Sequence, residues 1–223
     1  MINITEMLSK SLLAFDGQRD RSQQVEIGPS SILGCRRRVW HDLVQTPKTN
    51  ENTEHLAAIL GTFIHAGIEK SIRREDPFGD NFLIEVEVAH QGLKGHVDLF
   101  IKDQGLVVDW KTTKTKSLRY FPSNQQRMQV QVYGYLLAQN GYEVKQVALC
   151  AIPRDGEMAD IKTHVEDYNP EVALEGIAWL DEIKAIVANG EVPPPPTERL
   201  FFCSRYCSYY DATGEVGCPS MNK

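Results

Sequence analysis

The alternation of apolar and polar residues predicts a group of β-strands in the middle of the chain. β-Branched and aromatic residues fill residues 95–102 and 106–111, and the glycine-containing turn 103–105 separates the two runs, which is typical of a β-hairpin. Residues 81–89 alternate between apolar and polar positions and predict a strand that leads into this hairpin. Residues 144–153 and 160–166 predict further strands.

The helical spacing of apolar residues predicts helices on both sides of these strands. The predicted helices cover residues 2–15, 29–43, 54–74, 125–139 and 169–189. Pro29 with two serines and Asn169 with Pro170 are typical helix starts, and Asn140-Gly141 is a typical helix end. Prolines make residues 193–196 a stiff linker, and the tail, residues 197–223, shows little helical or strand pattern.

Asp98 and Asp109 lie inside the two hairpin strands, where core residues are expected. Burying a charge is costly, so each acid needs a partner, and a metal ion is the strongest candidate. If Lys102 pairs with Gly105 across a two-residue turn, the two acids lie opposite each other, with Cβ atoms about 4.5–5.5 Å apart. A four-residue loop also keeps them on one face, whereas a three-residue loop does not. The predicted site therefore depends on the length of this loop.

Other polar residues near the acids are candidates for the same site. Lys111 shares a strand face with Asp109. Glu85 and Glu87 share one face of the preceding strand, and we choose Glu87 as the additional metal ligand over a purely solvent-exposed role. His65 lies on a predicted helix, where a histidine is either a structural residue or, beside acids, a ligand.

Two groups of basic residues could bring phosphates to the acids. Residues 109–119 carry four basic residues against one acid, and Lys114, Lys116 and Arg119 belong to this group. A flexible lysine loop is the alternative interpretation. Arg36, Arg37 and Arg38 form a basic triplet, which is either a solvated surface or, beside a cleft, a phosphate contact.

Composition narrows the class of protein. The 223 residues are 42% hydrophobic and 24% charged, which is ordinary for a globular domain, and the net charge of −6 argues against broad polyanion binding. The chain lacks a run of roughly 18 apolar residues and a recognisable signal peptide, so we expect a cytoplasmic protein without membrane contact. No Gly-Lys pair occurs, so the chain has no P-loop and an ATP-driven motor would be a separate subunit.

The cysteines are divided between the tail and the rest of the chain. Cys203, Cys207 and Cys218 lie in the tail, which has too few apolar residues to order itself, so a bound metal or cluster would supply that order. Cys35 can supply the fourth ligand, and its alternative role is a buried structural residue. Cys150 lies within a predicted strand and is expected in the core.

Several short motifs follow one another along the chain, and together they point to a known family. They are Ser31-Ile-Leu-Gly-Cys35-Arg-Arg-Arg, Gly61-Thr-Phe-Ile-His65, Gly95-His-Val-Asp98, Asp109-Trp-Lys111 and Gln129-Val-Gln-Val-Tyr133, followed by the three cysteines of the tail. In this order the chain resembles the RecB-like branch of the PD-(D/E)xK nucleases, and most closely the iron–sulfur exonucleases associated with CRISPR systems and phages.

The resemblance implies a fold and a set of domain boundaries. The expected fold is α/β and restriction-endonuclease-like, with a mixed central β-sheet flanked by helices and a cysteine-clamped region that joins the N- and C-terminal segments. Residues 1–196 would form the nuclease domain, whose helical part, residues 1–75, includes Cys35. Residues 197–223 would complete an iron–sulfur site.

The resemblance also implies the chemistry of each candidate residue. Asp98 and Asp109 would bind Mg²⁺ or Mn²⁺ together with the His65 imidazole and the Trp110 carbonyl, and Lys111 would orient water or stabilise charge on the phosphate. Gln129 and Tyr133 would line the DNA side of the cleft, and Lys114, Lys116, Arg119, Arg36 and Arg37 are the other expected DNA contacts. A [4Fe–4S] cluster would bind the cysteines, which are Cys35, Cys203, Cys207 and Cys218.

The expected activity is that of a DNA exonuclease that acts on single-stranded or duplex ends in recombination, repair, replication or phage DNA processing, with a separate helicase or recombination protein as a partner. The alternatives are a non-catalytic DNA-binding subunit and a structure- or sequence-specific endonuclease. The tail cysteines are spaced more loosely than is usual in the family, which leaves a structural Zn²⁺ site as the alternative to the cluster.

Overall fold

The sheet at the centre of the molecule has both antiparallel and parallel strand pairs. The computed structural model describes residues 3–17, 27–50 and 56–221. In the described part of the chain the sheet has the order β1-β2-β3-β4-β5, in which β3 and β4 are parallel and the other neighbours are antiparallel. The strands are β1 (Phe82–His90), β2 (Leu93–Ile101), β3 (Leu106–Thr113), β4 (Gln146–Pro153) and β5 (Lys162–Asp167).

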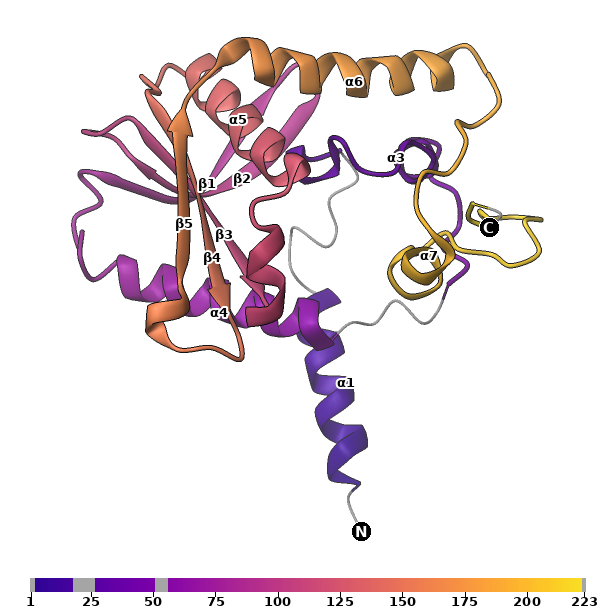
Figure 1. Cartoon of the computed structure of the whole chain (residues 1–223), viewed down its shortest axis with the longest axis horizontal. Coiled ribbons are helices and arrows are strands. Elements are labelled where there is room, and N and C mark those ends of the chain that lie inside the picture. Colours follow the sequence, from indigo (N-terminus) through magenta and orange to yellow (C-terminus); the bar gives the residue numbers. More distant parts are fainter. Residues whose placement is uncertain (1–2, 18–26, 51–55, 222–223) are drawn as a thin grey trace.

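Helices cover the two faces of this sheet (Figure 1). α5 (Asn124–Gln139) packs on one face and α6 (Pro170–Ala188) packs against α5. Buried residues of β2, β3 and β4 join Leu136, Leu180 and Ile183 in the main core. α4 (Leu56–Ile72) lies on the other face, where a smaller cluster is centred on Leu99 and Val108. The predicted fold class, a mixed central sheet flanked by helices, is confirmed.

A close approach between α4 and β3 fixes the position of the helix. Gly61 is buried, and a Cβ at this residue would lie only 2.8 Å from the Thr112 hydroxyl oxygen. Glycine therefore allows α4 to contact β3 more closely than any other residue would. His65 follows one helical turn later, so this contact also determines where its imidazole lies.

The sheet separates into two parts between β2 and β3. β1 pairs with β2 along most of its length, and β3 pairs with β4 along its whole length. β2 and β3, however, pair only from Ile101↔Leu106 to Leu99↔Val108. Beyond these pairs the two strands diverge, and this fork is the place where a site can form between the layers.

A small region beside the sheet contains segments from both ends of the chain. α3 (Arg36–Leu43) packs against α6, and α7 (Leu200–Tyr206) lies in the C-terminal segment (Figure 1). The Asn50 side chain donates to the carbonyl oxygens of Ser204 and Cys207, and the Tyr209 hydroxyl donates to Asp42. These bonds attach the C-terminal segment to residues 42–50.

Two predicted elements differ from the structure. The predicted helix over residues 29–43 is divided into a short 3₁₀ turn (Pro29–Ser31) and α3. Leu33 has a φ of 58°, and a Cβ at Gly34 would lie 2.9 Å from the Ser31 carbonyl oxygen, so the chain turns here instead of continuing as a helix. The tail was expected to lack regular structure, whereas it contains α7.

The remaining helices are close to the predicted ranges. α1 is Ile4–Gly17, and the 3₁₀ helices Thr115–Tyr120 and Met158–Asp160 lie in loops that were predicted without helical structure. The start of the predicted helix 54–74 and most of the polar segment 16–28 lie outside the described residues. None of the helices in the described ranges is both long and apolar enough to cross a membrane.

Candidate functional site

Asp98 and Asp109 lie at the fork between β2 and β3. The last β2–β3 pair is Leu99↔Val108, and extending this register by one residue places Asp98 opposite Asp109. The four-residue loop between Ile101 and Leu106 therefore gives the geometry expected from the sequence. Both side chains are about 2% exposed, and both line an open cleft of about 580 Å³. Two buried carboxylates therefore share one cleft.

The polar contacts of Asp98 leave one of its oxygens available. Its Oδ2 accepts a hydrogen bond of 2.8 Å from the Trp110 backbone N–H, which crosses the fork. Its Oδ1 is buried and has no hydrogen-bond partner among the residues described, although His65 Nδ1 lies 3.6 Å away. A buried carboxylate oxygen without a donor is a site for a cation.

Asp109 is part of a second set of contacts that holds Lys111. Lys111 Nζ lies 2.7 Å from Asp109 Oδ2 and donates to Gln129 Oε1 at 2.8 Å. Gln129, which is buried on α5, also donates from Nε2 to Asp109 Oδ1 at 3.2 Å. One amide thus orients both members of the ion pair, and the Lys111 ammonium is held at the wall of the cleft.

A third acid completes a group of ligand atoms beside Asp98. His65, Glu85 and Asp98 each offer one ligand atom, and these three atoms lie within 4.8 Å of one another. Glu85 has a φ of 51°, which costs a non-glycine residue about 1–3 kcal/mol and often marks a functional position. One nitrogen and two carboxylate oxygens form a donor set that suits Mn²⁺, and the carboxylates also suit Mg²⁺.

The structure places Glu85, not Glu87, in this group. The β1–β2 pairs Ile84↔Leu99 and Val86↔Val97 put Glu85 opposite Asp98, whereas Glu87 is paired with His96. The Glu87 carboxylate lies 2.8 Å from Lys94 Nζ and its side chain is 54% exposed. The strand register therefore favours Glu85 over Glu87, the other acid of the same face, as the third acid of the group.

The charges of the cleft shift the pKa values of its residues in different directions. Burial, together with the neighbouring Asp98, outweighs the opposing effect of Lys111 and raises the pKa of Asp109 to about 6. Burial also raises the pKa of Asp98, but the nearby His65 imidazole, with the Trp110 N–H, outweighs it, so the net shift is downward. Burial lowers the pKa of His65, but Asp98 reverses this and the net shift is upward. Without a metal, His65 thus favours the charged form of Asp98, whereas burial favours the neutral form of Asp109.

Several predicted DNA contacts lie elsewhere on the molecule. Lys114, Lys116 and Arg119 are exposed beyond the end of β3, and Lys114 and Lys116 line a separate hollow with Asp155. Trp110 lines the central cleft, as does Gln129. Lys114 and Lys116 therefore do not line the cleft itself, although they directly follow β3, which forms one of its walls.

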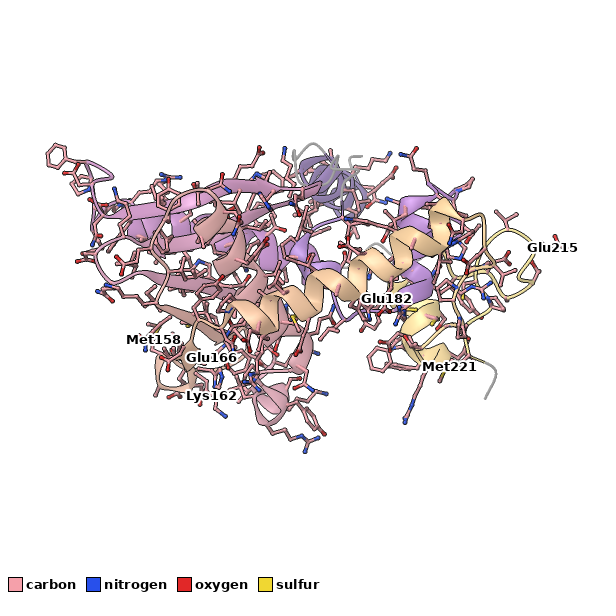
Figure 2. The ribbon with its side chains drawn as sticks, turned by 90° about the horizontal axis from the view of Figure 1, so that it is seen from above. Met158, Lys162, Glu166, Glu182, Glu215 and Met221 are labelled. Carbon is pink, nitrogen blue, oxygen red and sulfur yellow. The ribbon has the colours of Figure 1, made fainter. Side chains whose placement is uncertain are left out.

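Two of the residues predicted to contact DNA have side chains that already contact other parts of the protein. Tyr133 is 2% exposed and belongs to the main core, where it packs over Gly95. The Arg36 guanidinium is paired with Glu182 and lies over the Trp179 ring, both on α6. Figure 2 labels Glu182 on the half of α6 that reaches towards α3. Packing thus already uses the Tyr133 and Arg36 side chains, and neither lines the cleft. Arg37 is half-buried on the same helix as Arg36.

The four cysteines expected to act together line one cavity. Cys35 precedes α3, Cys203 lies on α7, and Cys207 and Cys218 follow it; all four surround a cavity of about 340 Å³. Burial raises the pKa of Cys203 to about 12, and the neighbouring thiols add to this shift. Cys150 is half-buried on β4, away from this cavity.

Comparisons with known proteins identify the type of fold. The family model of the PD-(D/E)XK nuclease superfamily matches residues 37–212. The crystal structure of SSO0001 matches with a TM-score of 0.61 and 20% identity, covering 99% of this chain and 98% of that one. LHK-Exo, in complex with dAMP, matches with a TM-score of 0.52 and 12% identity, covering 74% and 89%; the same exonuclease is described as an alkaline exonuclease from Laribacter hongkongensis. No curated protein sequence gives a significant match.

Replacing Glu85 with glutamine should weaken Mn²⁺ binding by about tenfold or more, because one anionic ligand of the group is lost. Glu87→Gln is the matched control on the same strand face, and it should leave the affinity unchanged. Isothermal titration calorimetry of the metal-free protein measures both. A loss of affinity in Glu87→Gln alone would contradict the assignment.

Proposed function

The chain belongs to the PD-(D/E)XK nuclease superfamily, and from this premise we propose that it is a divalent-metal-dependent DNA exonuclease that hydrolyses phosphodiester bonds at DNA ends. The observation that carries the proposal is the convergence of Asp98, Asp109 and Lys111 at the fork of the sheet. The match over residues 37–212 confirms the resemblance to the superfamily.

The donor set fits a divalent cation. The free Oδ1 of Asp98 and the ligand atoms of His65 and Glu85 are close enough for one ion to bind all three after small side-chain adjustments. Asp109 lies in the same cleft and can add a carboxylate oxygen, and Trp110 can add its carbonyl oxygen. When bound, the cation supplies a Lewis acid for the phosphate and lowers the pKa of a coordinated water.

Lys111 is positioned to act on the phosphate. Asp109 and Gln129 hold its ammonium at the cleft wall, so its geometry is set before substrate arrives. An ammonium in this place can donate to a phosphate oxygen as negative charge develops, or hold the attacking water in line. Gln129 acts as a positioning residue for Lys111.

Two features support an exonuclease over the other activities. LHK-Exo is named as an exonuclease, and its structure with dAMP contains a mononucleotide. The cleft of this chain is of a size that suits one or two nucleotides, and it is bounded by α1, α4 and the sheet. A separate helicase or recombination protein as partner stays a prediction.

Lys111→Met should reduce the rate of DNA cleavage by about 10²–10³-fold, because a preorganised charge at the phosphate is lost. Asp109→Asn should reduce it as well, by removing an anionic ligand. Release of nucleotides from end-labelled linear DNA in Mg²⁺ and in Mn²⁺ measures the rate, and Lys162→Met, an exposed lysine of β5, is the matched control.

Closed circular DNA separates the possible activities in the same assay. An exonuclease leaves the circle intact, whereas cleavage at a fixed site would favour an endonuclease. Wild-type protein that binds DNA but cleaves no substrate with either metal would contradict the proposal and favour a non-catalytic DNA-binding subunit.

We also propose that Cys35, Cys203, Cys207 and Cys218 hold a [4Fe–4S] cluster, which would join the N- and C-terminal segments. All four thiols line one cavity. A tetrahedral Zn²⁺ site with the same four cysteine ligands is the alternative.

Protein purified without oxygen should be brown and contain about four iron and four sulfide ions per chain. Cys203→Ser should lose most of the visible absorbance, because it removes one ligand, whereas Cys150→Ser should retain it. Metal analysis with visible spectroscopy measures both. A colourless protein with stoichiometric zinc would contradict the cluster and support the structural zinc site.

A further inference from the structure

An aromatic pair lies where α1 meets the catalytic cleft. Phe15 of α1 stacks on Phe63 of α4, with ring centroids 4.5 Å apart and ring planes 11° from parallel. Figure 1 shows that the C-terminal end of α1 is next to α4, while its N-terminal end projects away from the body of the molecule. The pair is therefore the contact through which α1 reaches the site.

The stacking contact with Phe63 covers only part of the Phe15 ring. Phe15 is 41% exposed and Phe63 is 40% exposed, although each ring covers one face of the other. The exposed surface of Phe15 must therefore lie on its other face and its edges. Phe15 also lines the cleft that contains His65, Asp98 and Lys111. An aromatic ring with an open face thus belongs to the wall of the proposed catalytic site.

We propose that Phe15 is a stacking platform for a nucleobase of the DNA strand that is being cleaved. This inference rests on the proposed nuclease function. The polar end of the cleft offers cation ligands and an ammonium, which suit a phosphate, whereas Phe15 offers only an apolar π-surface, which suits a base. One cleft therefore provides separate partners for the two chemically different parts of a nucleotide.

The chemistry of the platform indicates the form of substrate that it binds. A base can stack on a phenylalanine ring only when that face of the base is unstacked from its neighbour, so the platform selects a single-stranded or frayed end. Phenylalanine has no hydrogen-bonding group, so it cannot distinguish one base from another by hydrogen bonds. Support from Phe63 behind the ring restricts the rotation of Phe15 and lowers the entropy cost of stacking.

Binding of oligonucleotides with 2-aminopurine near the end tests stacking directly, in Ca²⁺ and with gel analysis to verify that the strand stays intact. Wild-type protein should quench the fluorescence of the base that stacks. Phe15→Leu should abolish this quenching and weaken single-strand binding by about 5- to 100-fold, and Phe15→Trp should restore both. Phe78→Leu is the matched control, because Phe78 is 87% exposed and lies outside the cleft.

Cleavage of strands with one abasic nucleotide identifies the base that stacks. Moving the abasic position along the strand should reveal one position that lowers kcat/KM for wild-type protein and has little further effect on Phe15→Leu, because both changes remove the same contact. Thermal unfolding of each variant checks that the fold is retained. The expected decrease in kcat/KM comes mainly from a higher KM, since Phe15 does not touch the reacting phosphate.

The outcomes separate this inference from the proposed function. Wild-type protein that cleaves DNA while Phe15→Leu binds and cleaves equally well would overturn the platform and leave the nuclease intact. Equal abasic penalties in wild type and Phe15→Leu would also overturn it. Wild-type protein that neither binds nor cleaves any DNA would overturn both.

Discussion

The burial of two carboxylates in one cleft at the fork of the sheet is the constraint on which the site depends. Asp98 and Asp109 are nearly inaccessible to water, and like charges in such a setting need compensation. The protein supplies it with His65 on one side and Lys111 on the other, and it leaves one oxygen of Asp98 without a donor. A divalent cation would complete this arrangement, so the same electrostatic cost that destabilises the metal-free site provides its affinity for metal.

The main features of this site could be predicted from the sequence, because they depend on short turns. The acids of the hairpin share one face of the sheet for any loop of even length, and the observed four-residue loop satisfies this condition. Choosing between Glu85 and Glu87 also required the conformation of the turn that joins β1 to β2. Gln91 and Gly92 both have positive φ, as in a two-residue type I′ turn, and this turn sets the register that places Glu85 opposite Asp98.

Other positions could not be predicted because they depend on contacts that are distant in sequence. Tyr133 has the helical spacing from Gln129 that would place both at a cleft, but the close approach of Gly95 buries its ring in the core. Arg36 is in a basic triplet typical of a phosphate site, yet a glutamate 146 residues later pairs with it. The role of Phe15 likewise depends on α4, and no local pattern indicates it.

The position of Mn²⁺ in a crystal tests the central claim most directly, because anomalous scattering locates the ion without reference to activity. The account predicts a peak bounded by His65, Glu85 and Asp98, with Asp109 beside it. A well-occupied peak at Glu87 and His96 instead, or crystals soaked in Mn²⁺ with no peak at the fork, would contradict it.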